Sequence, residues 1–326
     1  MFGLAAYAPD YAMLLVGANA GPIGMTKEHL AMIGSLGVPM IVVVTKIDYA
    51  PPEVLSETLQ SIKKLVKAAG RGSLVIRNAE EICMVFGWES GVRNGSLVPL
   101  IQVSNVTGQG IDLLKLGLSL LVPRVIAAGP SSAVELAVNE TYTVEGVGTV
   151  VSGTLLSGDL KVGQSLLLGP DERGEFQKTV VKGIHRRRTE VNAVHAVTSC
   201  SVALRKVIRS ELRRGSMLLS PAQLSREDCA VCMEFEADVL ILIHSTTITL
   251  KYQAVLHCGV IRQSVQIVEI IGREADSAVM RMGDRRRVRF KFIRHPEWIH
   301  LGQRLLFREG KTKGVGKIVA LHPVKT

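Results

Sequence analysis

The length, composition and charge of this chain already restrict what it can be. Its 326 residues suffice for two or three domains of the usual ~100 to 200 residues, and we expect three. Lysine and arginine number 39 against 29 acidic residues, a net charge of +10 that favours a polyanionic partner such as nucleic acid. Aromatic residues make up only 4%, which excludes reading of single strands mainly by base stacking, so any RNA should be held through its backbone.

The cysteines and the hydropathy pattern predict a cytoplasmic protein without a membrane segment. Five scattered cysteines suit reduced thiols better than a disulfide framework. No apolar stretch approaches the ~18 residues needed to span a bilayer. The single pair Cys229 and Cys232 has no second pair beside it, so we expect no metal site, and no constellation of catalytic side chains stands out.

Residues 1–123 have the pattern of an α/β domain. Apolar runs that predict strands buried on both faces of a parallel sheet span 12–16, 40–44 and 97–103. Helical patterns follow at 26–33 with Thr26 as the cap, at 54–69 and at 110–121. Residues 71–96 show no clear period, and we expect an irregular insertion there with a short helix over 80–86. Alternating strands and helices indicate an α/β fold.

The rest of the chain changes to closely spaced short strands separated by turn signals. This pattern predicts two small β-barrels, one over 133–221 and a second over 228–326, and Ser220-Pro221 marks the boundary between them.

Two loops directly after predicted strands contain the candidate ligand-binding residues. In open α/β sheets, ligands bind beyond the carboxyl ends of the strands. After the second strand comes Thr45-Lys46-Ile47-Asp48, and after the third comes Ser104-Asn105-Val106. A carboxylate at Asp48 accepts two hydrogen bonds from N1 and N2 of guanine, which adenine does not offer. We expect the stem of Lys46 to cover the base, the Asn105 amide to meet guanine O6, and Thr45 and Ser104 to tie the loops together.

This pair of loops resembles the fourth and fifth guanine-nucleotide motifs of GTPases, Asn-Lys-x-Asp and Ser-Ala-Lys. Thr45 stands in place of the asparagine, and Asn105-Val106 in place of Ala-Lys, which removes a lysine that stacks on the base. The resemblance therefore implies guanine binding, with a weakened hold on the base.

Further segments narrow the family. The segment Gly21-Pro-Ile-Gly-Met-Thr-Lys-Glu-His29 resembles the G-x-x-x-x-T-[RK]-E-H signature of translational GTPases such as elongation factor Tu. Similar matches occur at 146–154, in the hairpin that opens their second domain, and at 308–316, in the strand that closes their third. Together with 252–259 and 290–297, they make the chain similar to the GTP-binding protein 1 and 2 branch. The resemblance implies a partial P-loop GTPase domain, containing the last three strands of its sheet, followed by two β-barrels, with GTP or GDP as ligand.

The phosphate and magnesium loops of that family are absent from these 326 residues. No G-x-x-x-x-G-K-[ST] segment exists, since the one Gly-Lys-Thr at 310–312 has Leu305 where the first glycine should stand. The Asp-x-x-Gly-His segment that holds Mg²⁺ in the family is missing too. We therefore expect no GTP hydrolysis by this chain alone, and we interpret Met1 as an internal methionine of a longer protein.

Arginine clusters lie in both β-rich blocks. The two densest are Arg186-Arg187-Arg188 and Arg285-Arg286-Arg287. The corresponding domains of the family face aminoacyl-tRNA and the ribosome, so the resemblance implies phosphate contacts here. The sequence leaves open whether the mRNA-decay machinery is a further partner. It also leaves an alternative function: a non-catalytic RNA- or ribosome-binding adaptor with a vestigial GTPase domain.

Overall fold

The computed structural model describes residues 9–87, 91–122, 133–209, 212–243, 247–271, 279–310 and 312–324. The chain divides into two compact units, one over Pro9–Arg124 and one over Val125–Thr326, and each is described by itself. None of the helices in the described ranges combines the length and hydropathy that a membrane span requires.

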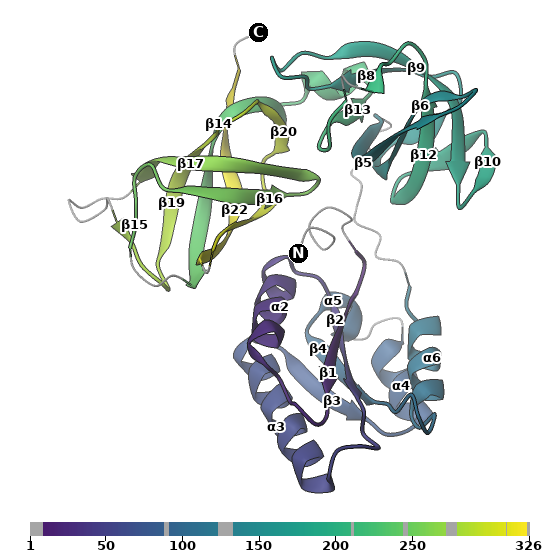
Figure 1. The fold of residues 1–326 in the computed structure, drawn as a ribbon, viewed down its shortest axis with the longest axis vertical. Helices are drawn as coiled ribbons and strands as arrows, with labels where there is room; N and C mark the ends of the chain where they lie inside the picture. The colour runs from purple at the N-terminus through teal and green to yellow at the C-terminus, as the bar shows by residue number, and fades with distance from the viewer. Residues whose placement is uncertain are drawn as a thin grey trace. The chain divides into compact units, whose positions relative to one another are not determined.

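The first unit is a parallel four-stranded sheet with helices on both faces (Figure 1). The strand order is β1-β2-β4-β3. The strands are β1 Ala12–Gly17, β2 Met40–Thr45, β3 Gly72–Ile76 and β4 Leu97–Gln102. The helices are α2 Gly24–Ser35, α3 Pro52–Ala68, α4 Ala79–Phe86, α5 Gly91–Asn94 and α6 Ile111–Ser119.

The central strand β2 and the edge strand β1 differ in burial. Every residue from Met40 to Val44 is buried, as the unbroken apolar run predicts. In β1 the side chains alternate, and Met13 and Leu15 are 48% and 57% exposed. The prediction that this run is buried on both faces is wrong for β1, where one face is exposed and, among the described residues, only β2 pairs with it.

The segment 71–96 is more regular than its sequence suggests. It contributes β3, which pairs in parallel with β4, so the sheet has one strand more than the three predicted. The short helix expected there is confirmed as α4, whose first turn is capped by Asn78 through its Oδ1 and the Glu81 amide, 2.9 Å apart. Helix α2 begins earlier than predicted, at Gly24, so Thr26 lies inside its first turn rather than at the cap.

Two helical layers enclose this sheet. On one face α4, α5 and α6 pack over an apolar cluster that includes Ile41, Val43 and Ile101. Figure 1 shows α2 and α3 on the opposite face, where Ile62 and Val66 of α3 are buried. This arrangement leaves the carboxyl ends of the strands free for loops.

The second unit contains two β-barrels, of which the first closes through the pairing of β8 with β9. Its ladder runs β10-β9-β12-β6-β5-β13-β8. The strands are β5 Glu135–Val144, β6 Gly148–Ser157, β7 Asp159–Lys161, β8 Ser165–Gly169, β9 Gln177–Arg186, β10 Thr189–Val191, β11 Ala193–His195, β12 Thr198–Leu204 and β13 Met217–Leu219. A short 3-10 helix, η2 Pro221–Ser225, leads to the next barrel.

The other barrel closes through the pairing of β14 with β19, and its ladder runs β19-β17-β16-β21-β22-β14-β20. The strands are β14 Cys229–Ile243, β15 Ile248–Thr249, β16 Gln253–Cys258, β17 Ile261–Ile271, β18 Val279–Met280, β19 Arg285–Phe292, β20 Glu297–His300, β21 Arg304–Glu309 and β22 Thr312–Pro323. Its core is aromatic, with Phe235 and Phe292 rings 5.2 Å apart. Burial raises the pKa of both Cys229 and Cys232 to about 12, so these thiols stay protonated at neutral pH.

A mixed apolar and polar joint connects the two barrels. Trp298 of β20 is buried in a cluster with Ala137, Met217 and Leu219 of the first barrel. Its Nε1 donates to Glu135 over 3.3 Å. On the same strand Glu297 accepts from the Arg213 guanidinium at 2.7 Å. Both carboxylates are buried, and each is hydrogen-bonded across the joint.

Candidate guanine-binding site

The loop after β2 presents Asp48 to solvent at the carboxyl edge of the sheet. Lys46 takes a left-handed backbone conformation with φ of 60°, which turns the chain directly after the strand. The Tyr49 amide then donates to the Lys46 carbonyl at 3.2 Å and closes the turn. Both Lys46 and Asp48 are exposed. Among the described residues no side chain or backbone group engages the Asp48 carboxylate, so both its oxygens are free to accept from a ligand.

The loop after β4 is folded around the buried hydroxyl of Ser104. Its Oγ accepts from the amides of Val106 and Thr107, at 3.2 and 3.1 Å. Between residues 104 and 109, as the structure describes them, every amide donates within the loop except that of Asn105. The loop therefore offers one free backbone donor, and it lies at the position where the sequence places the contact with guanine O6.

Backbone groups hold the two loops beside each other. The Val103 amide donates to the Val44 carbonyl at 2.8 Å, and the Ile47 amide reaches the Val103 carbonyl at 3.5 Å. The sequence assigned this tie to Thr45 and Ser104. The Ser104 hydroxyl accepts within its own loop, so the part of these two residues in joining the loops stays a prediction.

A third loop, after β1, supports the first two and was missed from the sequence. The Ala18 amide donates to the Thr45 carbonyl at 2.8 Å. The Ala18 carbonyl in turn accepts from the buried Thr58 hydroxyl of α3 at 3.0 Å. Thr45 is thereby held from the side of β1, and through Ala18 from α3. Alanine and threonine carry no sequence signal for such a role, which depends on the fold bringing β1 beside β2.

Gly110 is the other residue that the sequence did not single out. It precedes α6 with φ of 72°. A Cβ there would lie 1.9 Å from the Gln102 carbonyl oxygen. Only glycine fits both the conformation and the space. The signal that could have found it is the Thr-Gly-Gln-Gly run at 107–110, between β4 and α6.

These loops together present a defined pattern of hydrogen-bond donors and acceptors. Asp48 offers two acceptor oxygens, and Asn105 offers an N–H donor. A purine with donors at N1 and N2 and an acceptor at O6 complements that set, whereas adenine presents the opposite pattern at these atoms. Val106, which stands where the family motif has a lysine, is 84% exposed and brings no charged stem to this part of the loop.

The described residues contain no group of three or more His, Cys, Asp or Glu side chains that could hold a metal ion.

The predicted RNA-contacting arginines divide into free and engaged groups. Arg186, Arg187 and Arg188 are exposed at the hairpin between β9 and β10, and the last two line a cavity of about 790 Å³. On β19, Arg285 and Arg286 are exposed, and no described residue forms an ion pair with either. Arg287 instead donates to Asp238 at 3.0 Å. Two further ion pairs, Arg289 with Glu236 and Lys291 with Glu234, join the same two strands, so the three pairs form a cross-strand ladder.

Comparison with known proteins agrees with this arrangement. A family model described as "Elongation factor Tu GTP binding domain" matches residues 3–157, and one described as "Elongation factor Tu domain 2" matches residues 148–219. GTP-binding protein 1 of Xenopus laevis is 44% identical over 323 residues, which cover 98% of this chain and 47% of that protein. Residues 3–219 of this chain are thus similar to the elongation factor Tu-like family of GTP-binding proteins. The resemblance predicted from its motifs to the GTP-binding protein 1 and 2 branch is confirmed.

A further relative and a solved structure support the same fold. GTP-binding protein 2 of Homo sapiens is 34% identical over 328 residues, covering 99% of this chain and 53% of that protein. The chain thus spans about half the length of the curated relatives it matches. The apo structure of translation elongation factor SelB from Methanococcus maripaludis has a TM-score of 0.73 at 22% identity, covering 99% of this chain and 67% of that one. The predicted fold class, an α/β GTPase-type domain followed by two β-barrels, is confirmed.

Proposed function

We propose that this chain selects guanine nucleotides by their base, through Thr45, Lys46, Asp48, Ser104, Asn105 and Val106, and contacts aminoacyl-tRNA or the ribosome through its β domains. One observation carries the proposal. An unengaged carboxylate, Asp48, and an unengaged amide, that of Asn105, lie in two loops that are hydrogen-bonded together at the ends of adjacent parallel strands. Relatives named GTP-binding protein 1 and GTP-binding protein 2 support the same ligand class.

We propose three domains with boundaries 1–123, 133–221 and 228–326. The division of the chain into compact units after Arg124 supports the first boundary. The end of the match to the second elongation factor Tu domain, at residue 219, supports the second. Buried, free cysteines support a reducing compartment, and a cytoplasmic location is part of the proposal.

Titration of the purified chain with GDP and with ADP tests base selection. We expect GDP to bind roughly 5 to 150 times more tightly, because a bidentate base contact contributes about 1 to 3 kcal/mol. Asp48→Ala should reduce that ratio to near one. Glu53→Ala, which removes a neighbouring exposed carboxylate at the start of α3, should leave it unchanged. A ratio near one in the unaltered chain would contradict the proposal.

Phosphate binding and hydrolysis are proposed to be absent from this chain as it stands. The sequence contains no phosphate-loop pattern to surround the β- and γ-phosphates. GTP and GDP should therefore bind with similar affinity, and turnover of GTP by pure material should remain at background.

A basic groove on the first barrel supports RNA contact. Arg187 and Arg188 occupy a two-residue turn with φ of 51° and 68°, where asparagine and glycine are the favoured residues. Bulky residues there cost about 1 kcal/mol each in backbone strain. Lys206, with φ of 57°, lies beside a neighbouring cavity of about 990 Å³, and Lys182 and Val147 line both cavities. Strained basic residues around a groove suit a site that binds phosphates.

The double variant Arg187→Asn/Arg188→Gly should change stability and RNA binding in opposite directions, so it tells the two roles of this turn apart. The double variant should raise the free energy of unfolding by about 1 kcal/mol, because the turn then has its preferred residues. It should also weaken binding to tRNA and lower the slope of log K against log salt by about 1.5, as two phosphate contacts are lost. Lys63→Gln/Lys67→Gln on exposed α3 positions removes the same charge and should leave the slope unchanged. Filter binding that does not distinguish the two variants would refute RNA contact at this turn.

The alternative function is a non-catalytic RNA- or ribosome-binding adaptor. It predicts intact tRNA binding with no nucleotide binding at all. The two titrations above therefore decide between the functions. No described residue favours the mRNA-decay machinery over these partners.

A further inference from the structure

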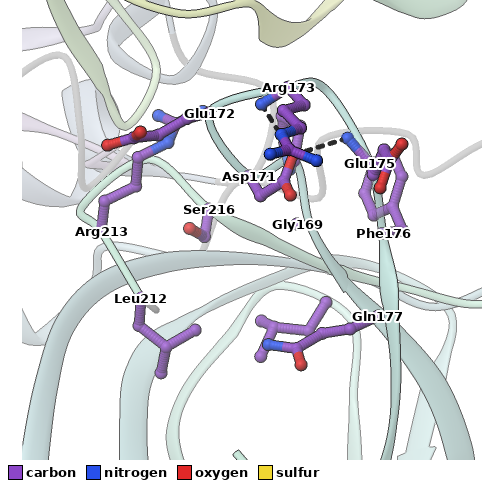
Figure 2. Close-up of a pocket in the computed structure, with 12 residues that line it drawn as sticks. Gly169, Asp171, Glu172, Arg173, Glu175, Phe176, Gln177, Leu212, Arg213 and Ser216 are labelled. Atoms are coloured by element: carbon purple, nitrogen blue, oxygen red, sulfur yellow. Dashed lines mark hydrogen bonds between the residues drawn. The ribbon is translucent and has the colours of Figure 1, made fainter. Parts of the chain in front are cut away.

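A cavity of about 480 Å³ lies in the first β-barrel next to its joint with the second. One wall is the loop 168–177, and the other is the segment 212–216 (Figure 2). Nothing in the guanine site or the basic groove involves these residues.

The cavity is acidic on a strongly basic chain. Asp171, Glu172 and Glu175 line it, against Arg173 and Arg213. The Arg213 guanidinium is already paired with the buried Glu297 at 2.7 Å and donates to the Pro296 carbonyl at 3.1 Å. Its charge is therefore largely neutralised within the joint. The remaining carboxylates outnumber Arg173, so the cavity attracts cations although the chain carries a net charge of +10.

The acidic loop is held in a fixed shape by its own hydrogen bonds. Asp171 Oδ1 accepts from the amides of Arg173 and Glu175, each at 2.8 Å, as drawn in Figure 2. Glu172 and Glu175 are exposed and form no ion pair with any described residue. Their carboxylates are thus available at the rim of a preformed cavity.

A buried hydroxyl inside the cavity points independently to a ligand. Ser216 lines the cavity, yet only 2% of its surface is exposed. Its backbone groups are used, because its carbonyl accepts from the Val138 amide at 2.9 Å and its amide donates to the Arg213 carbonyl at 3.3 Å. Its Oγ has no hydrogen-bond partner among the described residues. Buried hydroxyls normally have a hydrogen-bond partner, and a donor on a ligand would provide one for the Ser216 hydroxyl.

The apolar part of the cavity lining suits a hydrocarbon chain that carries a cationic group at its end. Leu168, Leu212 and the ring of Phe176 contribute to the walls. An alkyl chain can lie along such surfaces while its charged end reaches a carboxylate. An aromatic ring also attracts a cation placed over its face.

We propose that this cavity binds a primary alkylammonium group, with Ser216 accepting one ammonium hydrogen and Glu172 and Glu175 balancing the charge. The same chemistry is carried by a free polyamine and by a lysine side chain of a partner protein. The inference does not depend on guanine binding.

A ligand bound in this cavity would affect the contacts at the joint between the barrels. Phe176 packs edge-on against Trp298, with ring centroids 5.9 Å apart. A Cβ on Gly174 would lie 3.2 Å from Pro296 and from Val231 of the second barrel, so the acidic loop rests directly on that barrel. A ligand that binds this loop only in the folded protein should therefore raise the unfolding temperature of the whole β unit.

Calorimetric titration of the nuclease-treated full chain tests the proposal. The probes are spermidine and Nα-acetyl-lysine methylamide, with Nα-acetyl-norleucine methylamide as the uncharged control. We expect saturable binding of at least one amine and none of the control. Tighter binding of spermidine identifies a polyamine site, and tighter binding of the lysine derivative identifies a docking site for a lysine side chain.

Two variants locate the binding. Glu172→Gln/Glu175→Gln should weaken it at least tenfold, and Ser216→Ala should weaken it about three- to tenfold, the usual effect of one hydrogen bond. Glu53→Gln/Glu80→Gln removes two exposed carboxylates elsewhere and should leave the affinity unchanged. Absence of saturable amine binding up to millimolar concentration, or equal binding by the Glu172 and Glu53 double variants, would overturn the proposal.

Discussion

Trp298→Ala should lower the free energy of unfolding of the β unit by about 3 to 5 kcal/mol, the usual range for removing a buried aromatic side chain. Trp298 is 4% exposed and fills the joint between the barrels. Its loss also removes a donor from the buried carboxylate of Glu135, leaving the His300 contact at 2.6 Å. The two barrels should then unfold as separate calorimetric transitions, because this apolar cluster helps to couple them.

Tyr142→Ala is the matched control, since Tyr142 is an aromatic residue of the first barrel that is 45% exposed. It should change the unfolding free energy by less than about 1 kcal/mol. A Trp298→Ala protein that still unfolds in one transition at an unchanged temperature would show that the joint is not what couples the barrels.

Gly110→Ala should cost about 2 to 4 kcal/mol and abolish guanine selection. The added methyl group would meet the Gln102 carbonyl oxygen at 1.9 Å, in a backbone conformation that alanine already disfavours. The clash can be relieved only by moving the loop that carries Ser104 and Asn105. The free Asn105 amide should then leave its place opposite guanine O6.

Gly108→Ala isolates the conformational part of that effect. Gly108 has φ of 78°, close to the value at Gly110, but an added Cβ meets nothing within 4 Å. It should cost only about 1 kcal/mol and leave the GDP to ADP ratio largely intact. Equal losses of stability and selectivity in the two variants would mean that the contact with Gln102 is unimportant.

The fold could be predicted wherever the apolar pattern was long and unbroken. The run from Met40 to Val44 indicates a central strand because every residue in it must be buried. The strand at Gly72–Ile76 was missed because it is short, begins with glycine and lies at a sheet edge. Edge position also explains β1, whose exposed Met13 and Leu15 cannot be distinguished from buried residues by sequence alone.

The candidate site was predictable in its side chains but not in its backbone. Asp48 and Asn105 follow apolar runs, and their chemistry matches a purine edge. The unpaired Asn105 amide, and the support of Thr45 by Ala18, depend on hydrogen bonds between loops far apart in sequence. For the same reason Arg287 could not be separated from Arg286, because its partner Asp238 lies on another strand.

The complementarity of Asp48 with the purine edge is tested most directly by exchanging the base and the side chain together. Xanthine keeps the N1 donor of guanine but has a carbonyl acceptor at C2 in place of the amino donor. The side-chain amide introduced by Asp48→Asn would offer one acceptor and one donor, the set that xanthine requires. Competition binding of GDP and xanthosine diphosphate should therefore favour GDP in the unaltered chain and xanthosine diphosphate in Asp48→Asn. An unchanged preference in Asp48→Asn would contradict base recognition by this residue.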